Sequence, residues 1–569
     1  MIRDEQLIAA QDALREGNFQ QAEALFSDIL DTNPENVHAL DGMGVLRCRA
    51  DNHIAGVEYF TEALRQIPSR NSSGELSETE VRQAQATLCY RLGVAQRALG
   101  NKEEALEAFR SAVELAPNEP ESLINLAQLQ FETDCLPDAV ESFRKLTVLQ
   151  PENASAWLTL GYILTLQGKF ADSLPPLEEA RRLDPTSPDA CFFLAESLRK
   201  VERFEDSLPH YQQMLQVALE WPQAVHGYGK SLIPLGHLED GWDAMEFRLA
   251  GSVGSWVRHA LPNWEGTESD DRTVLAYSEE GIAADLLYAS CLPDLVNQVG
   301  HVVVECDTAL HGLFRRSFPR ATVVPITPET VEPNHNPWGL ALDEQVAFGS
   351  LPRFFRRQKD DFPMRRVYFV ADDDRIERWT NRLSEIGAAP KIGVLWQGTW
   401  TSETEKQTVL PMFDLRNLML RNQSNAAWVF LQHGSRQKEI DQYRRNVSLQ
   451  IRLYPEAFQY DLDEMAGLLS SLDLVLTPPG YIAHLAAALG ARTWVILPAA
   501  ADWRWSLGTL WHPTAKLFRQ KIGQPWTDVF QEVHTELNKF LASYIQPSEE
   551  QPVTLAFPEQ RVNRLRRAA

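Results

Sequence analysis

A histidine near the start of an expected helix is the first residue of this sequence whose position suggests chemistry. The segment 481–490, YIAHLAAALG, reads as a buried helix with His484 one turn in. Because the first N–H groups of a helix lack intrahelical partners and carry partial positive charge, they suit a bound diphosphate. The imidazole would add a hydrogen bond, and Arg504 and Lys406 would neutralise the charge of the anion. The alternative is that His484 only caps or packs this helix.

The sequence around this helix alternates between strand and helix patterns. Beyond about residue 250, short runs rich in β-branched residues are separated by amphipathic segments. The strands expected from these runs are 273–277, 301–306, 321–326, 391–396, 426–432, 473–477 and 493–498. Helices are expected between them, the first over 282–300, and the run Asp372 to Asp374 is interpreted as a solvated interlobe segment. Such alternation predicts two Rossmann-like lobes of parallel strands, with ligands at the carboxyl ends of the strands.

The first half of the chain repeats with a period of 34 residues. Pro34 and Pro68 are 34 residues apart, and three later prolines keep the same spacing: Pro117, Pro151 and Pro185. The gap of 49 residues between Pro68 and Pro117 is one repeat plus fifteen residues, which we place in a loop over 69–80 because of its polar composition. This spacing is the pattern of tetratricopeptide (TPR) repeats.

Each repeat of this kind is a helix pair that must stack on its neighbours to bury its apolar face. Small residues are expected where the paired helices approach closely: Gly44, Gly93, Ala127, Gly161 and Ala195. Proline is expected to end the second helix. Six repeats and a degenerate seventh, marked by Gly241 and Trp242, predict an α superhelix over residues 1–250. Because such arrays bind proteins or extended peptides in a concave groove, we expect a protein or peptide partner there.

Several segments of the second half together carry a family resemblance. They are 477–520, with His484-Leu485-Ala486 and Asp502-Trp503-Arg504-Trp505, and 290–295, 315–319, 349–353 and Gly241 to Arg248. From 273 to about 543 the chain resembles bacterial TPR-fused glycosyltransferases related to the heptosyltransferases (glycosyltransferase family nine). Its architecture is similar to that of O-linked N-acetylglucosamine transferases. The resemblance implies a metal-independent GT-B fold, in which two Rossmann-like lobes flank the site of a nucleotide-sugar donor.

The resemblance also implies roles for particular residues. The donor-binding candidates are His484, Leu485, Gly480, Tyr481, Lys406, Gln432 and Arg504. The candidates for the general base are Asp285, Asp307 and His311, none of which stands in a specific motif. No bound cofactor and no metal are expected, and a nucleotide sugar of unknown identity would be the co-substrate.

Three turns depart from the family pattern. The first strand–helix turn reads Gly281-Ile282-Ala283-Ala284, where relatives carry Gly-x-Gly-Asp. Pro478-Pro479 stands before the His-Leu-Ala helix and removes N–H donors, and Lys406 stands where an arginine is expected. In the TPR groove, asparagines hold substrate backbone in O-linked N-acetylglucosamine transferases, and only Asn125 here matches one of those positions. Backbone clamping by such a ladder is therefore not expected.

Charge and composition narrow the classes of partner. The formal net charge is −24, from 54 basic and 78 acidic residues. Because so acidic a surface repels phosphate backbones, no nucleic-acid partner is expected. The sequence shows no signal peptide and no membrane span, and its six cysteines are too far apart for a disulfide framework or a metal site. These features favour a cytoplasmic location.

The sequence thus predicts a TPR domain over 1–250, a linker over 251–271, lobes over 272–385 and 386–545, and a tail over 546–569. The first functional hypothesis is a glycosyltransferase that modifies a protein presented by the TPR domain, such as a surface or flagellar protein. The second is a TPR scaffold whose GT-B region is catalytically inactive. The oligomeric state, the stereochemical outcome and the identity of the acceptor stay open.

Overall fold

The computed structural model describes residues 2–71, 77–217, 221–250, 261–326, 338–362, 367–398, 409–432, 451–458, 462–499 and 501–545. The chain forms two compact units, Met1–Ser197 and Leu198–Ala569. The predicted tail 546–569, the candidate Lys406 and residues 251–260 of the predicted linker lie outside the described residues.

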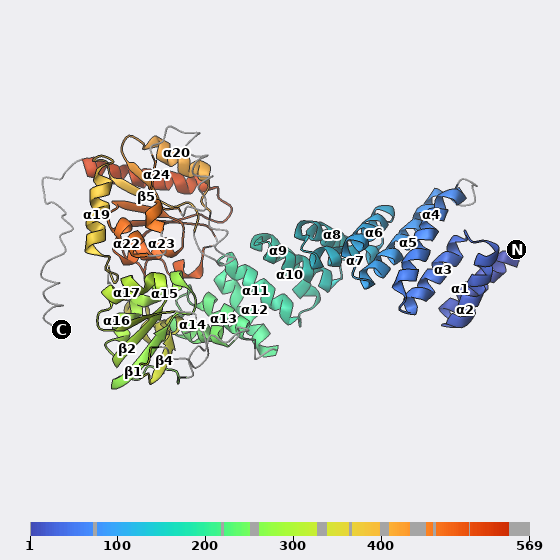
Figure 1. Ribbon diagram of the computed structural model, residues 1–569, viewed down its shortest axis with the longest axis horizontal. Coiled ribbons are helices and arrows are strands. Elements are labelled where there is room, and N and C mark those ends of the chain that lie inside the picture. The colour runs from blue at the N-terminus through green and yellow to red at the C-terminus, as the bar shows by residue number, and fades with distance from the viewer. Residues whose placement is uncertain are drawn as a thin grey trace. The chain divides into compact units, whose positions relative to one another are not determined.

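The first unit is a stack of helices that pair in chain order (Figure 1). They are α1 (Ile2–Arg15), α2 (Phe19–Thr32), α3 (Val37–Arg49), α4 (His53–Asn71), α5 (Glu78–Ala98), α6 (Lys102–Leu115), α7 (Pro120–Glu132), α8 (Leu136–Leu149), α9 (Ala154–Leu166), α10 (Phe170–Leu183) and most of α11 (Pro188–Lys200). From α1 to α10, each helix packs against the next. This confirms the predicted helical solenoid.

Glycines stand at tight contacts between the two helices of a pair. A Cβ added at Gly44 would lie 2.5 Å from the ring of Phe60, and one added at Gly161 would lie 2.4 Å from Leu177. The ring of Phe60 is buried and Leu177 is fully buried. Glycine is therefore required by space at these positions, because a side chain would push the two helices apart.

The loop expected over 69–80 is wrong at both ends. Helix α4 continues past Pro68 to Asn71, although four other repeat prolines follow their helices. Helix α5 starts at Glu78 with a capping box: Ser77 Oγ accepts the Glu80 N–H at 3.3 Å, and the Glu80 carboxylate accepts the Ser77 N–H at 2.9 Å. Some of the extra residues, those described at the end of α4 and the start of α5, therefore lengthen two helices, and α5 reaches 21 residues.

The second unit opens with helices and continues as an α/β region. Its first complete helices are α12 (Phe204–Val217), α13 (Pro222–Leu232) and α14 (Leu238–Met245). A 3-10 turn, η1 (Glu246–Leu249), follows α14. The first sheet has the strands β1 (Ser269–Tyr277), β2 (Val299–Cys306), β3 (Thr322–Pro325) and β4 (Glu344–Ala347). All its strand pairs are parallel, in the order β3-β2-β1-β4.

The second sheet is larger and also entirely parallel. Its strands are β5 (Lys391–Val394), β6 (Ala427–Phe430), β7 (Ile451–Leu453), β8 (Leu474–Thr477), β9 (Thr493–Leu497) and β10 (Lys516–Arg519). They lie in the order β10-β9-β8-β5-β6-β7. The chain therefore reverses direction across this sheet between β5 and β8, as it does between β1 and β4 in the first. Such a point leaves a crevice at the carboxyl ends of the strands.

The helices of the α/β region differ from the expected ones in several places. They are α15 (Ile282–Tyr288), α16 (Leu292–Leu295), α17 (His311–Ser317), α18 (Leu351–Phe355), α19 (Asp373–Ser384), α20 (Met412–Arg421), α22 (Leu462–Ser470), α23 (Tyr481–Ala488) and α24 (Trp526–Ile545). The single helix expected over 282–300 is broken after Tyr288, and β2 already begins at Val299. The aspartate run starts α19, because Asp372 caps it by accepting the Arg375 N–H at 3.1 Å.

The helix pair α13–α14 belongs to the core of the α/β region. Ile233, Leu238, Trp242 and Met245 share one hydrophobic cluster with residues of both sheets and their helices. Trp242 is 1% exposed, its Nε1 donates to Arg356 O at 2.8 Å, and its ring meets those of Trp503 and Trp511 at 5.9 and 6.2 Å. The last helix pair and the two sheets therefore form one packed body.

All six cysteines have free thiols, and four of them are buried. Within the described ranges, none of the helices combines the length and the apolar character that crossing a bilayer requires. Nor do three His, Cys, Asp or Glu side chains of the described residues gather so as to hold a metal ion.

Candidate functional site

Two glycine-containing turns meet where the second sheet reverses direction. The chain leaves β5 through Gln397 and Gly398, and it leaves β8 through Pro479 and Gly480. A Cβ added at Gly398 would lie 3.1 Å from Pro479 O, and Gly480 has φ 151°, a backbone conformation that favours glycine. The two turns thus bring bare backbone together at the switch point of the sheet, the place where doubly wound sheets generally bind ligands.

The predicted donor residues take different places around this point. Gly480 and Tyr481 lie at the start of α23, and the side chain of Leu485 is fully buried in the core. Gln432 follows β6 and is 2% exposed, with its Oε1 accepting the Gln397 N–H at 3.3 Å. Gln432 therefore orients the turn after β5.

The imidazole of His484 is packed inside the protein. It is 3% exposed, its Nδ1 lies 2.9 Å from His512 Nε2, and its ring stacks on Trp505 with centroids 4.7 Å apart. One of the two ring nitrogens must carry the shared proton. Burial lowers the pKa of His484 well below its ordinary value, and the neighbouring His512 and Arg504 lower it further. Burial also lowers the pKa of His512, to about 3. Both rings are therefore neutral near pH 7.

Acid should destabilise the protein through these two histidines. Their pKa values are depressed in the fold, so only the unfolded chain takes up protons as the pH falls below about 6.5. Each histidine should remove about 1.4 kcal/mol of unfolding free energy per pH unit below that point. His512→Asn should lower the slope of stability against pH by about one such contribution, as measured by urea denaturation between pH 7 and 4.5.

The buried carboxyl of Asp285 acts in the opposite direction, because its raised pKa retains a proton in the fold. It is present in both proteins and cancels in their difference. An unchanged slope in His512→Asn would contradict the assignment of a buried neutral pair.

Arg504 is held by carboxylates on two sides. Its Nη1 lies 3.1 Å from each oxygen of Asp502, and its Nη2 donates to Glu280. Asp502 also caps the 3-10 turn η10 (Trp503–Trp505) by accepting the Arg504 N–H at 3.0 Å. Nearby Asp502 and Glu280 raise the pKa of Arg504 although burial opposes this. The guanidinium is therefore charged and already partnered.

The three base candidates lie beyond the carboxyl ends of the strands of the first sheet. Asp285 is 1% exposed and accepts from Ser278 Oγ at 2.5 Å, and its burial raises its pKa well above the ordinary value. Asp307 caps a short 3-10 turn by accepting the Ala309 N–H at 2.8 Å. His311 Nε2 lies 3.3 Å from Val323 O of β3. Asp285 and Asp307 are near enough to interact electrostatically, whereas His311 contacts the backbone of β3.

The side chain of Arg248, from η1, lies at the point where the first sheet reverses direction. Arg248 pairs with Glu279 at 2.6 Å, with Glu246 at 3.0 Å and with Glu280 at 3.4 Å. Glu279 follows β1 and also accepts the Gly349 N–H, after β4, at 2.9 Å. A Cβ added at Gly349 would lie 2.5 Å from Glu279 Oε1. This cluster thus joins the end of the helix pair α13–α14 to the carboxyl ends of β1 and β4.

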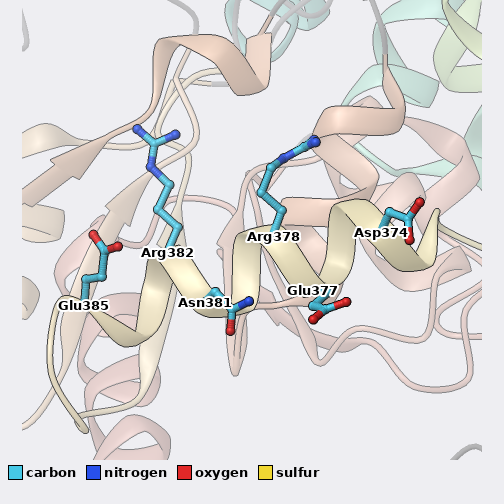
Figure 2. Close-up of a pocket in the computed structure, with 6 residues that line it drawn as sticks. All are labelled: Asp374, Glu377, Arg378, Asn381, Arg382 and Glu385. Carbon is cyan, nitrogen blue, oxygen red and sulfur yellow. The ribbon is translucent and has the colours of Figure 1, made fainter.

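A surface hollow of about 530 Å³ lies away from these turns. Figure 2 shows its six lining residues on α19 and its end: Asp374, Glu377, Arg378, Asn381, Arg382 and Glu385. All six are polar, and Arg378 is engaged by Glu464 at 2.5 Å. Because none of its lining residues is apolar, this hollow lacks the usual features of a small-molecule site.

Sequence comparisons match the first unit to family models and more than half of the chain to a curated protein. Two family models match residues 86–119, and residues 9–71 and 124–188. Both describe the tetratricopeptide repeat. The helix pairs of the first unit are therefore TPR repeats, which are protein-interaction scaffolds. Protein FlbA of Caulobacter vibrioides is 27% identical over 329 residues, which cover 55% of this chain and 54% of FlbA. The chain thus spans about half the length of this curated relative.

Part of the chain is also similar to solved structures. YrrB, described as a TPR protein with an unusual peptide-binding site, is 16% identical with a TM-score of 0.30, covering 35% of this chain and 96% of its own. MamA of Desulfovibrio magneticus is 21% identical with a TM-score of 0.27, covering 29% and 91%. PilF of Pseudomonas aeruginosa is 17% identical with a TM-score of 0.29, covering 40% and 94%.

Within the TPR repeats, the one asparagine of the expected ladder is engaged by its own array. The Asn125 amide donates to Glu121 O at 2.9 Å, and its oxygen accepts from Arg97 at 3.3 Å. Aromatic rings continue along the following repeats, with Tyr162 4.6 Å from Phe193 between ring centroids. Sequence reasoning selected Asn125 but missed its ion-pairing neighbour Arg97, because that neighbour comes from the preceding repeat.

Proposed function

We propose that the α/β region is a GT-B glycosyltransferase with two Rossmann-like lobes, which transfers a sugar from a nucleotide sugar to a protein bound by the TPR repeats. The strand order of the second sheet carries this proposal. Numbered along the chain, its strands lie as 6-5-4-1-2-3, the order of dinucleotide-binding sheets. The glycine turns at Gly398 and Gly480 support a diphosphate at its switch point, because bare backbone can approach an anion.

The acceptor belongs to the same proposal. The family resemblance suggests a surface or flagellar protein, and the TPR repeats supply a surface for such a partner. The reaction needs no bound cofactor, because the nucleotide sugar is itself the co-substrate. A general base must deprotonate the acceptor hydroxyl if the reaction inverts the anomeric centre. Asp307 is the most accessible of the two acids beyond β1 and β2, since Asp285 is 1% exposed.

The alternative is a TPR scaffold with an inactive α/β region, and specific observations favour it. Pro478 and Pro479 lack the N–H groups that an anion would use before α23. The imidazole of His484 is enclosed by His512 and Trp505, and burial of Asp285 raises the pKa of its carboxyl well above the ordinary value. These residues would then stabilise a fold whose ligand site is lost.

Ligand-induced stabilisation separates the two functions. Thermal denaturation with UDP-, ADP-, GDP- and CMP-sugars should show one nucleotide class that raises the unfolding free energy by about 2.7 kcal/mol at a hundred times its Kd. The same nucleotide sugar should be hydrolysed slowly by the protein alone. No stabilisation and no hydrolysis with any of the four would leave the scaffold function.

A matched pair of glycine variants tests the position of the donor. Gly480→Ala strains the turn before α23, and Gly523→Ala strains a turn with φ 76° beyond β10; neither Cβ would clash. Each should cost roughly 1 kcal/mol of stability, because both backbones favour glycine. Only Gly480→Ala should weaken nucleotide-sugar binding, at least tenfold by isothermal titration calorimetry. Equal binding by the two variants would place the donor elsewhere.

A further inference from the structure

Four carboxylates and two arginines form a continuous chain of ion pairs in the second unit. Arg248 of η1 pairs with Glu246, Glu279 and Glu280, and Arg504 of η10 pairs with Asp502 and Glu280. Glu280 is the acid that touches both guanidiniums. It therefore links the turn after β1 with η10, which follows β9.

Glu280 differs from the other acids because the arginines do not depend on it. Without it, Arg248 would keep Glu246 and Glu279, and Arg504 would keep Asp502. Removing one partner of a buried ion pair is costly when it leaves the other charge uncompensated. Here both arginines would keep at least one carboxylate partner. Glu279 and Asp502 also accept backbone N–H groups, from Gly349 and Arg504 respectively. Within the described residues, Glu280 has no such backbone role.

The surroundings of Arg504 offer unused hydrogen-bonding capacity. Its Nε is buried and has no hydrogen-bond partner among the described residues, and the same holds for the Tyr288 hydroxyl. The Arg504 and Glu280 side chains are 19% and 22% exposed, so their ion pair reaches the surface. Glu280 precedes Gly281, which has φ 87° and no atom within 4 Å of an added Cβ. The turn that carries Glu280 thus has room to move.

We propose that Glu280 is an exchangeable latch on Arg504, which phosphate oxygens of a nucleoside diphosphate displace. This rests on the proposed nucleotide-sugar function and adds how its site is regulated. A phosphate group presents several oxygens to a guanidinium and keeps its charge compensated when Glu280 leaves. The exchange needs only a local movement, because other contacts that hold the α/β region together do not involve Glu280: Arg316 of α17 pairs with Asp463 of α22, and Tyr368 N donates to Ala488 O at 3.1 Å. In the unliganded protein, Glu280 thus competes for the anion site.

Titration of the full chain with inorganic pyrophosphate, and separately with UDP, tests the latch. Glu280→Gln removes the competing charge and should bind pyrophosphate at least tenfold more tightly than the unaltered protein. Glu246→Gln is the matched control, because Glu246 pairs with Arg248 but not with Arg504; its affinity should stay within twofold. The double variant Glu280→Gln/Arg504→Gln should not show the gain in pyrophosphate affinity.

Equal affinity of Glu280→Gln and the unaltered protein would overturn the latch, as would the same gain in Glu246→Gln or no pyrophosphate binding by either. If Glu280→Gln does not fold by circular dichroism, Glu280→Ala, which also removes the competing charge, replaces it with the same expected gain. The proposed function fails separately. If Glu280→Gln binds pyrophosphate more tightly but no nucleotide sugar stabilises the protein, the latch is supported and the glycosyltransferase function is overturned. If nucleotide sugars bind with an affinity that neither Glu280→Gln nor Arg504→Gln changes, the glycosyltransferase function is supported and the latch is overturned.

Discussion

A chain that begins at residue 251 should fail to fold, whereas one that begins at residue 187 should fold cooperatively. The shorter chain lacks Ile233, Leu238, Trp242 and Met245, which are buried in the core of the α/β region. Burying one such side chain contributes about 1.5–3 kcal/mol. The four together are comparable with the whole stability of a typical domain, about 5–15 kcal/mol. Starting at residue 187 keeps Ser187, whose hydroxyl accepts the Ala190 N–H at 3.2 Å and caps α11.

Size-exclusion chromatography and circular dichroism on the two shortened chains provide the measurement. The chain 187–569 should be monodisperse and show a cooperative thermal transition, and the chain 251–569 should aggregate or melt without one. In the full chain, Trp242→Ala should cost about 3–5 kcal/mol, because it opens a cavity and removes a ring between Trp503 and Trp511. A cooperative transition of 251–569 at the temperature of 187–569 would show that the helix pair is dispensable.

Arg248→Ala should be the most destabilising single change of charge in the second unit. It would leave Glu246, Glu279 and Glu280 together without their shared guanidinium, and the Arg248 side chain is only 7% exposed. Removing one partner from a buried pair typically costs about 3–5 kcal/mol. Arg248→Lys should recover only part of this, because an ammonium cannot match the several directions in which the guanidinium donates.

Arg353→Ala provides the matched control for this prediction. Arg353 pairs with Asp243 at 2.8 Å, but the two side chains are 35% and 45% exposed. Such a pair contributes about 0–1 kcal/mol. Urea denaturation monitored by tryptophan fluorescence should therefore separate the two alanine variants by at least about 2 kcal/mol. Equal losses would mean that water screens the Arg248 cluster as it screens the surface pair.

The repeats and the strand–helix alternation were predictable because each follows a local period. Prolines 34 residues apart and β-branched runs mark elements that neighbouring residues specify. Two strands of the second sheet were missed: β7 is three residues long, and β10 lies within a segment read only for its resemblance. The prediction of a loop over 69–80 was wrong because it relied on polar composition, whereas the capping box of Ser77 and Glu80 starts a helix there. Composition describes a solvated surface equally well on a loop and on a helix.

For the candidate site, the sequence indicated the local elements but not the contacts between distant residues. The sequence placed Gly480 in the turn after β8 and His484 in the helix that follows it. It did not reveal His512, because that partner lies 28 residues away and its contact with His484 arises only in the folded chain. In the same way, Glu280 and Arg504 meet across 224 residues. Charged partners so far apart have no spacing that a single sequence could show, whereas a turn and its helix are contiguous.

The shared core of α13–α14 and the two sheets sets where this gene can gain or lose repeats. Recombination between similar repeats inserts or deletes whole helix pairs. An exchange within the first unit changes the length of the array and leaves Trp242 and Arg248 in their contacts. An exchange that removes α13–α14 also removes part of the α/β core. Natural variants of this architecture should therefore differ in repeat number only before Leu198, so that the reach toward a partner varies while the last pair is inherited with the sheets.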